Sequence, residues 1–279
     1  MQTHLYVVAF LTLLLTACGG NFSAQTPEDF SAVAIVGGKD TTKDHVASKY
    51  VVMIFDNATQ KYCTGALIRK DIVITAAHCL GSKAESLTLA FGLKPMAGDY
   101  IMRPVAKVLL HESFSKSNLR DRNDLALLKI KGEAPAGYKT LLLPESDFVV
   151  RPQQGFTAVG YGRTSGKKAS PTDNQGSGHL RHVDLIINSL SENENQFYVD
   201  QTTYRGICNG DSGGPGLMRW NGQDYVVGIV SAMSWTSPDE ASSGGVSQDT
   251  RDICAEKSIY ISVKKYRTWI AEGIKKLTN

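Results

Sequence analysis

The sequence lacks a strong net charge, a membrane-spanning run and a metal-binding cysteine pattern. Its formal net charge of +3 is too small to indicate nucleic acid as a partner. The apolar run over residues 5–17 is shorter than the about 20 residues that a membrane-spanning helix needs. The four cysteines after residue 18 lack the paired short spacings of a zinc site, so we expect no metal and no other cofactor.

Basic residues are absent from the first 34 residues, although a signal peptide usually begins with one or more. The position and length of the apolar run still favour a signal peptide over residues 1–17. Residues 15–19 read Leu-Thr-Ala-Cys-Gly, which is similar to the lipobox of bacterial lipoproteins and predicts lipidation of Cys18. Cys18 is also the cysteine left over if the other four pair. A signal peptide with an incidental cysteine is the alternative. We expect the polar residues 18–34 to form a leader that ends at an activation junction.

Short apolar or alternating runs, separated by turn residues, occupy most of the chain after residue 35. Spacing of this kind predicts an all-β fold and is compatible with two antiparallel barrels that meet near residues 144–152. Residues 266–277 have the periodicity of an amphipathic helix, which we expect to pack on a barrel and not on a membrane. The runs are residues 50–55, 63–68, 72–75, 87–91, 102–110, 125–130, 156–159, 181–187, 216–220, 225–231 and 258–263.

Residues 206–215, Gly-Ile-Cys-Asn-Gly-Asp-Ser-Gly-Gly-Pro, carry the strongest chemical signal. A serine is a poor nucleophile unless a base lies beside it and donors face the oxyanion that it creates. The glycines allow a sharp turn that exposes Ser212 and directs the N–H groups of Gly210 and Ser212 into one space. The alternative is an ordinary glycine- and proline-rich surface turn.

Two upstream stretches supply the missing partners. His78 follows the apolar residues 72–74 within Thr-Ala-Ala-His-Cys, and Asp124 precedes the apolar run Leu-Ala-Leu-Leu-Lys-Ile. With these stretches, the chain from residue 35 onwards resembles the trypsin/chymotrypsin-like serine proteases, which use the same chain order of His, Asp and Ser. The other histidines have no matching context, and we interpret them as signal-segment or surface residues: His4, His45, His111, His179 and His182.

The resemblance implies a fold, a mechanism and two disulfides. The fold would be two antiparallel six-stranded β-barrels, residues 35–145 and 146–279, with a closing C-terminal helix. His78 would act as general base, Asp124 would orient it, and Ser212 would form an acyl-enzyme held by the oxyanion hole. Disulfides Cys63–Cys79 and Cys208–Cys254 are implied in the same way, although the sequence alone allows three pairings of four cysteines.

The resemblance also implies a zymogen. Cleavage before Ile35 would free an α-ammonium that turns inward and pairs with the carboxylate of Asp211. Breaking such a buried pair typically costs about 3–5 kcal/mol. Ala34, the residue before this junction, suits the specificity that we expect, so we hypothesise that the enzyme activates itself.

Specificity is expected to depend on a narrowed, uncharged pocket. Gly206 stands where trypsin has an aspartate, which argues against selection of basic side chains by that route. Met233 and Ser258 stand where the family usually has glycine, which favours an elastase-like preference for small or medium apolar residues. An acid within residues 234–252 could alter this preference. The residues that we expect to line the pocket are Gly206, Ile207, Ser231, Met233 and Ser258.

Two other classes of protein are compatible with this sequence. The first is a catalytically inactive, protease-like binding protein, and the second is a lipid-anchored surface protein in which the enzyme fold is incidental. For an active protease we expect protein or peptide substrates, protein inhibitors, a monomeric state and no nucleic acid. We expect export from a bacterial cell, with a precursor held at the envelope only through Cys18 and a mature form that could be released.

Overall fold

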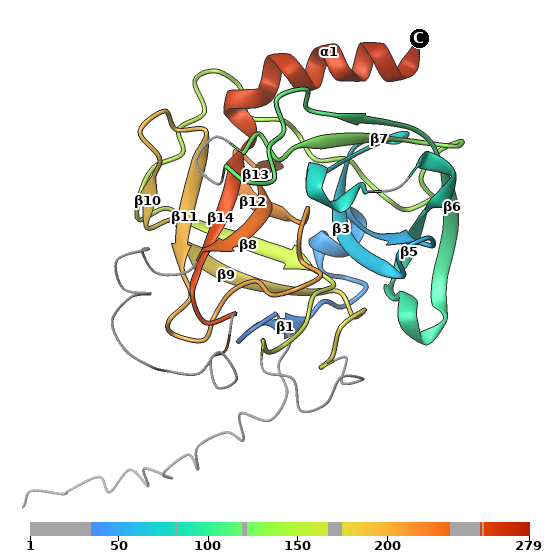
Figure 1. Ribbon diagram of the computed structural model, residues 1–279. Coiled ribbons are helices and arrows are strands. Elements are labelled where there is room, and N and C mark those ends of the chain that lie inside the picture. Colours follow the sequence, from blue (N-terminus) through green and yellow to red (C-terminus); the bar gives the residue numbers. More distant parts are fainter. Residues whose placement is uncertain (1–34, 82, 119–121, 167–174, 235–251, 253) are drawn as a thin grey trace, which may run out of the picture. The chain divides into compact units, whose positions relative to one another are not determined.

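The computed structural model describes residues 35–81, 83–118, 122–166, 175–234, 252 and 254–279, drawn in colour in Figure 1. The signal peptide, Cys18, the leader and nearly all of the 234–252 insertion lie outside these residues. β-Strands dominate the described part of the chain, and its α-helix is α1 (Arg267–Thr278). Among these residues there is no helix with the length and hydropathy that crossing a membrane requires.

The first half of the described chain forms a closed antiparallel barrel. Branched and aliphatic side chains alternate along its strands, so that Val52, Ile54, Leu67 and Val73 meet in one buried cluster. Closure leaves the barrel without a free edge, which favours a rigid platform. In barrel order the strands are β2 (Val51–Asp56), β3 (Lys61–Arg69), β4 (Ile72–Thr75), β7 (Ala126–Ile130), β6 (Asp99–Leu110) and β5 (Leu87–Lys94).

The second half forms an antiparallel sheet around an aromatic core. The rings of Phe197 and Tyr260 stack with centroids 4.9 Å apart, and Phe156 meets both edge-on. Two-residue strands stand at both ends of the hydrogen-bonded order. That order is β1 (Lys39–Asp40), β9 (Arg181–Ile186), β8 (Gly155–Gly160), β12 (Pro215–Trp220), β13 (Gln223–Ser234), β14 (Lys257–Ser262), β11 (Gln196–Asp200) and β10 (Ser189–Leu190).

Short 3₁₀ helices lie at several strand ends. The one that matters for the site is η2 (Ala77–Cys79), which follows β4 and contains His78. The others are η1 (Val46–Lys49), η3 (Ala84–Ser86), η4 (Pro95–Ala97) and η5 (Val263–Tyr266).

The all-β prediction with one C-terminal helix is confirmed, and the structure adds two crossings between the halves. Strand β1, early in the chain, pairs with β9 of the second sheet. Helix α1, at the end of the chain, packs on β6 and β7 of the first barrel, where Gly273 lies against Leu127 and Leu109. Each half therefore contacts a segment from the opposite end of the described chain: β1 pairs with the second sheet, and α1 packs on the first barrel (Figure 1).

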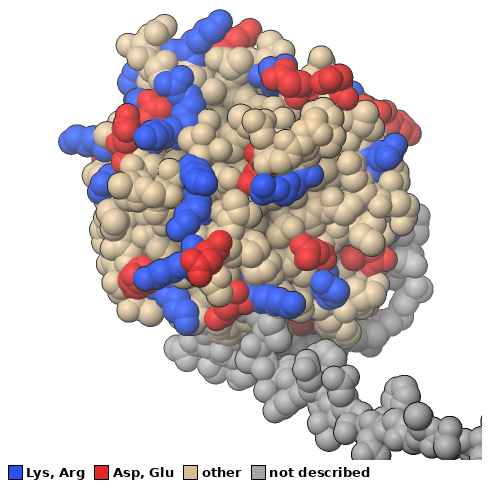
Figure 2. Space-filling model, turned by 180° about the vertical axis from the view of Figure 1, so that it is seen from behind, with Lys and Arg blue, Asp and Glu red and all other residues tan. Residues whose placement is uncertain are grey.

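Charged side chains of both signs are interspersed on the face shown in Figure 2. No single sign dominates that face, in keeping with the small net charge of +3. A field of one sign would be needed to attract a polyanion such as nucleic acid.

Candidate active site

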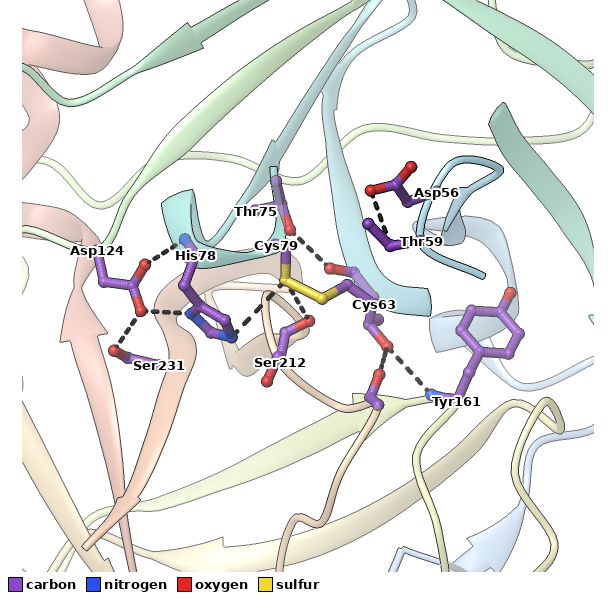
Figure 3. Close-up of a disulfide and its surroundings, with 12 residues drawn as sticks. Asp56, Thr59, Cys63, Thr75, His78, Cys79, Asp124, Tyr161, Ser212 and Ser231 are labelled. Carbon is purple, nitrogen blue, oxygen red and sulfur yellow. Dashed lines mark hydrogen bonds and ion pairs between the residues drawn. A yellow bond between two sulfur atoms is a disulfide. The ribbon is translucent and has the colours of Figure 1, made fainter. Parts of the chain in front are cut away.

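His78 and Asp124 are brought together by the pairing of β4 with β7. Thr75 at the end of β4 lies opposite Ala126 at the start of β7, so the residues just outside both strands share one edge of the barrel. His78 Nδ1 lies 2.7 Å from Asp124 Oδ2, and the backbone N–H of His78 donates to Oδ1 at 2.8 Å (Figure 3). Because an ionised carboxylate only accepts, Nδ1 carries the proton and Nε2 of the neutral ring is left to accept one.

Asp124 is fully buried yet held in its ionised form. Burial acts to raise its pKa, but the hydrogen bonds and charge of His78 and the Ser231 hydroxyl outweigh it and lower the pKa below its usual range. Ser231 Oγ donates to Oδ2 at 2.6 Å. The Arg122 guanidinium, which sequence reasoning missed, places Nε 3.4 Å from the same oxygen.

Ser212 lies on the side of the His78 ring opposite Asp124 (Figure 3). Among the described residues no hydrogen bond joins Ser212 Oγ to the imidazole, and Nε2 has the sulfur of Cys79 at 3.9 Å. Hydroxyl–imidazole contacts in serine hydrolases are often long before substrate binds. The structure thus gathers the three predicted side chains, with the His–Asp contact formed and the Ser–His contact open.

The turn around Ser212 requires its glycines. Gly210 and Gly213 have φ of 100° and 79°, a region that other residues rarely adopt. A Cβ on Gly210 would lie 2.4 Å from the Tyr62 ring, and one on Gly213 would lie 2.0 Å from Thr75 Oγ1. Within the described part of the chain, the N–H groups of Gly210 and Ser212 donate to no acceptor. Two such donors beside a serine can stabilise an oxyanion.

Thr64 of β3 ties the serine turn to the first barrel and was not predicted. Its backbone N–H donates to the Ser212 carbonyl at 2.9 Å. Its Oγ1 donates to the Gly210 carbonyl at 2.8 Å and accepts from the Tyr161 N–H at 3.2 Å. The one available signal was its place directly after Cys63, which is too weak to identify a functional residue.

Both predicted disulfides are present. Cys63–Cys79 joins β3 to η2 with an S–S distance of 2.04 Å, next to His78 (Figure 3). Cys208–Cys254 joins the segment before the serine turn to the segment before β14. Among the described residues, the one group of three potential metal ligands is His78 with Cys63 and Cys79, and the two sulfurs bond each other and so cannot act as thiolate ligands.

The predicted activation pair is buried in the uncut chain. Ile35 and Asp211 both have no exposed surface, and the Val36 carbonyl accepts from the Gly206 N–H at 2.9 Å. Asp211 accepts from the N–H groups of Gly162 and Cys208 at 2.7 and 2.8 Å. Burial raises the pKa of Asp211 to about 7, although these two N–H groups and the Arg181 charge oppose the rise.

The residues predicted to line the pocket lie around the ends of β13 and β14. Met233 pairs with Ser258 across these strands, and Met233 also packs against the Cys208–Cys254 disulfide. Gly206, Ile207 and Ser258 are all buried. Of the acids in the 234–252 insertion, the structure describes Asp252, which accepts from Ser165 Oγ and from the N–H groups of Gly166 and Cys254.

A His–Asp pair next to a serine in a glycine turn, on an all-β frame with two disulfides, defines the class of trypsin-like serine proteases. The chain belongs to that family, because residues 35–270 match the family model described as Trypsin. Granzyme H of Homo sapiens is 27% identical over 99% of this chain and 100% of its own length. Mast cell protease 8 of Mus musculus is 32% identical over 75% of this chain and 83% of its own. Cathepsin G of Mus musculus is 28% identical over 65% and 70%.

Proposed function

We propose that this protein is a serine endopeptidase that hydrolyses peptide bonds through an acyl-enzyme on Ser212. The observation that carries the proposal is the ionised Asp124 holding the His78 ring, with Nε2 directed away from Asp124 toward the side where Ser212 lies. His78 takes the Ser212 proton as Oγ attacks the carbonyl carbon, and gives that proton to the departing amine. Water then attacks the ester carbonyl carbon, His78 takes a proton from the water, and His78 gives that proton to Ser212 Oγ as the acid product leaves.

The oxyanion of each tetrahedral intermediate would be held by the N–H groups of Gly210 and Ser212. Both groups are unengaged within the described residues, so neither must break a bond before it can donate. Loss of one such donor in enzymes of this kind reduces kcat by about 10²–10³. Thr64 would keep these donors in place through its contacts with Gly210 and Ser212.

Activation by cleavage before Ile35 is part of the proposal. In the uncut chain the buried carboxylate of Asp211 accepts hydrogen bonds from two backbone N–H groups of the described residues and has a pKa of about 7. A new ammonium on Ile35 would supply the missing counter-charge and favour the ionised carboxylate. We also propose that the enzyme activates itself by cleavage after Ala34, and that the protein is exported and lipidated at Cys18.

A preference for small or medium apolar residues before the scissile bond completes the proposal. It is supported by the absence of an acid at Gly206 and by the narrowing side chains of Met233 and Ser258. The substrates would be proteins or peptides, as membership of a protease family implies.

Labelling with a peptidyl phosphonate ester tests this function directly. We expect mature protein to be labelled at Ser212, identified by mass spectrometry, and to lose peptidase activity in proportion. Ser212→Ala should not be labelled and should lose activity by at least about 10⁴-fold. Ser113→Ala, at an exposed serine, is the control and should behave as wild type. A cut, folded protein that is neither labelled nor active would instead indicate the inactive binding protein.

A further inference from the structure

Gln201 is a fully buried residue directly after β11 that neither the proposed mechanism nor the sequence motifs use. Its Nε2 donates to the carbonyls of Ile207 and Cys254, each at 3.0 Å. Its Oε1 accepts from the Ile207 N–H at 2.7 Å. A buried glutamine side chain with three hydrogen bonds has one well-defined position, because losing any of them would leave a buried polar group unpaired.

The Gln201 side chain occupies the space that a side chain on residue 206 would need. A Cβ built on Gly206 would lie 2.1 Å from Cδ, 2.2 Å from Oε1 and 2.4 Å from Cγ of Gln201. The Gln201 carboxamide therefore occupies the volume that a side chain on residue 206 would fill, and it fits there because residue 206 is glycine.

The carboxamide also bridges two of the segments expected to wall the pocket. Ile207 and Cys254 belong to the same two segments that the Cys208–Cys254 disulfide joins. Both Nε2 hydrogens are used in this bridge, so no free N–H points to a ligand and no formal charge is present. Gln201 has no exposed surface, so no solvent-accessible space borders its side chain.

We propose that Gln201 is a specificity-determining residue that closes the substrate side-chain pocket beneath Gly206. The inference rests on the proposed peptidase function and names the structural limit on its substrates. Short uncharged side chains end above the carboxamide, whereas long apolar or aromatic ones collide with it. A lysine or arginine would bring a charge to a neutral, buried amide whose hydrogen-bond partners among the described residues include no carboxylate, which is strongly unfavourable.

The test measures kcat/KM for peptides that differ only in the residue before the scissile bond: Ala, Val, Leu, Met, Phe and Lys. For the mature wild-type enzyme we expect the highest values with Ala or Val and values at least about tenfold lower with Phe and Lys. Gln201→Ala should raise the Leu/Ala and Met/Ala ratios by about tenfold or more, since the pocket becomes deeper. Gln201→Glu should raise the Lys/Met ratio similarly, because these side chains are close in length and differ in charge.

Gln196→Ala is the matched control, because Gln196 lies in β11, is 1% exposed and accepts from the Tyr198 hydroxyl. This variant should keep the wild-type ratios whatever it does to stability. Folded Gln201 variants with unchanged ratios would overturn the inference while leaving the peptidase function intact. A wild-type enzyme that prefers Phe or Lys would also overturn it, even if no Gln201 variant folds. A wild type that cleaves no peptide and escapes phosphonate labelling would refute the function itself, and this inference with it.

Discussion

At the scale of single residues, the site depends on how one buried carboxylate is shared. Asp124 Oδ2 faces His78 Nδ1, Ser231 Oγ and Arg122 Nε, while Oδ1 receives the His78 backbone N–H. The motif of an aspartate before the apolar run Leu-Ala-Leu-Leu-Lys-Ile identified Asp124 from the sequence. The same motif did not show that the Arg122 side chain turns back onto that carboxylate, because side-chain direction in a loop depends on its surroundings.

Replacing Arg122 should alter the pH dependence of the reaction. The Arg122 side chain is 13% exposed, so its charge is only partly screened from Asp124. It competes with a protonated His78 for the same carboxylate oxygen. We expect Arg122→Gln to move the midpoint of the acid limb of kcat/KM upward by about half to one pH unit. Arg122→Lys should stay close to wild type, and an unmoved midpoint in Arg122→Gln would show that Arg122 has no electrostatic role.

At the scale of elements, strand β3 fixes the serine turn. Thr64 is fully buried, and its hydroxyl both donates to Gly210 and accepts from Tyr161. The pattern of apolar residues predicted a strand at 63–68. The pattern does not show which residue of this strand contacts the distant serine turn, because that contact depends on how the two halves of the fold meet.

Thr64→Val should weaken both stability and catalysis. Valine has nearly the same shape but leaves the Tyr161 N–H and the Gly210 carbonyl without their partner, which costs about 1–3 kcal/mol in unfolding free energy. We expect kcat to fall more than KM rises, because the oxyanion donors lose their support. Urea unfolding and steady-state kinetics measure the two effects. Thr59→Val, at an exposed threonine that donates to Asp56, is the control.

Next to the pairing of β1 with β9, two of the histidines that the sequence predicts to be surface residues contact each other. The rings of His45 and His182 stack with centroids 3.9 Å apart, and Thr41 Oγ1 lies 3.0 Å from His182 Nδ1. Both side chains are partly exposed, and strand pairing brings His182 opposite Lys39, close to the loop that holds His45.

The stability of this edge should decrease in acid. Burial lowers the pKa of His182, and the charges of His45 and Lys39 add to this effect while Asp184 opposes it. Because the unfolded chain takes up the proton first, this stability is fully present above the ordinary histidine pKa near 6.5 and is lost as pH falls below it. We expect the urea midpoint of His182→Phe to depend less on pH between 7 and 5 than that of wild type. Parallel curves for the two proteins would contradict the assignment.

At the scale of the whole molecule, Asp211 connects the serine turn to strand β8 and to the segment after it. Gly160 and Gly162 make room for its carboxylate, since a Cβ on either would lie within 2.3 Å of a carboxylate oxygen. Its neighbours come from strand β8, from the segment after that strand and from the turn itself. Such convergence is a property of the assembled fold.

Uncut and cut protein should lose stability in different pH ranges. In the uncut chain the pKa of Asp211 is raised to about 7, so the unfolded chain loses this proton first. The contribution of Asp211 to the stability should therefore be fully present below pH 4 and fall by a few kcal/mol as pH rises to 7. In the cut protein the Ile35 ammonium should remove that decline and introduce a loss at alkaline pH, where the amine deprotonates. Urea unfolding of Ser212→Ala protein, uncut and cut, measures this, and Asp211→Asn should flatten both curves.

The sequence by itself determined the family, the all-β architecture and the identity of His78, Asp124 and Ser212 as candidates, because each is written in a local motif or a local period, and the two disulfide pairings followed from the resemblance to the family. Only the tertiary structure decided that Thr64 supports the serine turn, that Arg122 shares Asp124, and that Gln201 fills the space beside Gly206. These contacts join residues whose motifs are ordinary. They arise from strand register and from the meeting of two halves, and no local stretch of sequence encodes where distant side chains will touch.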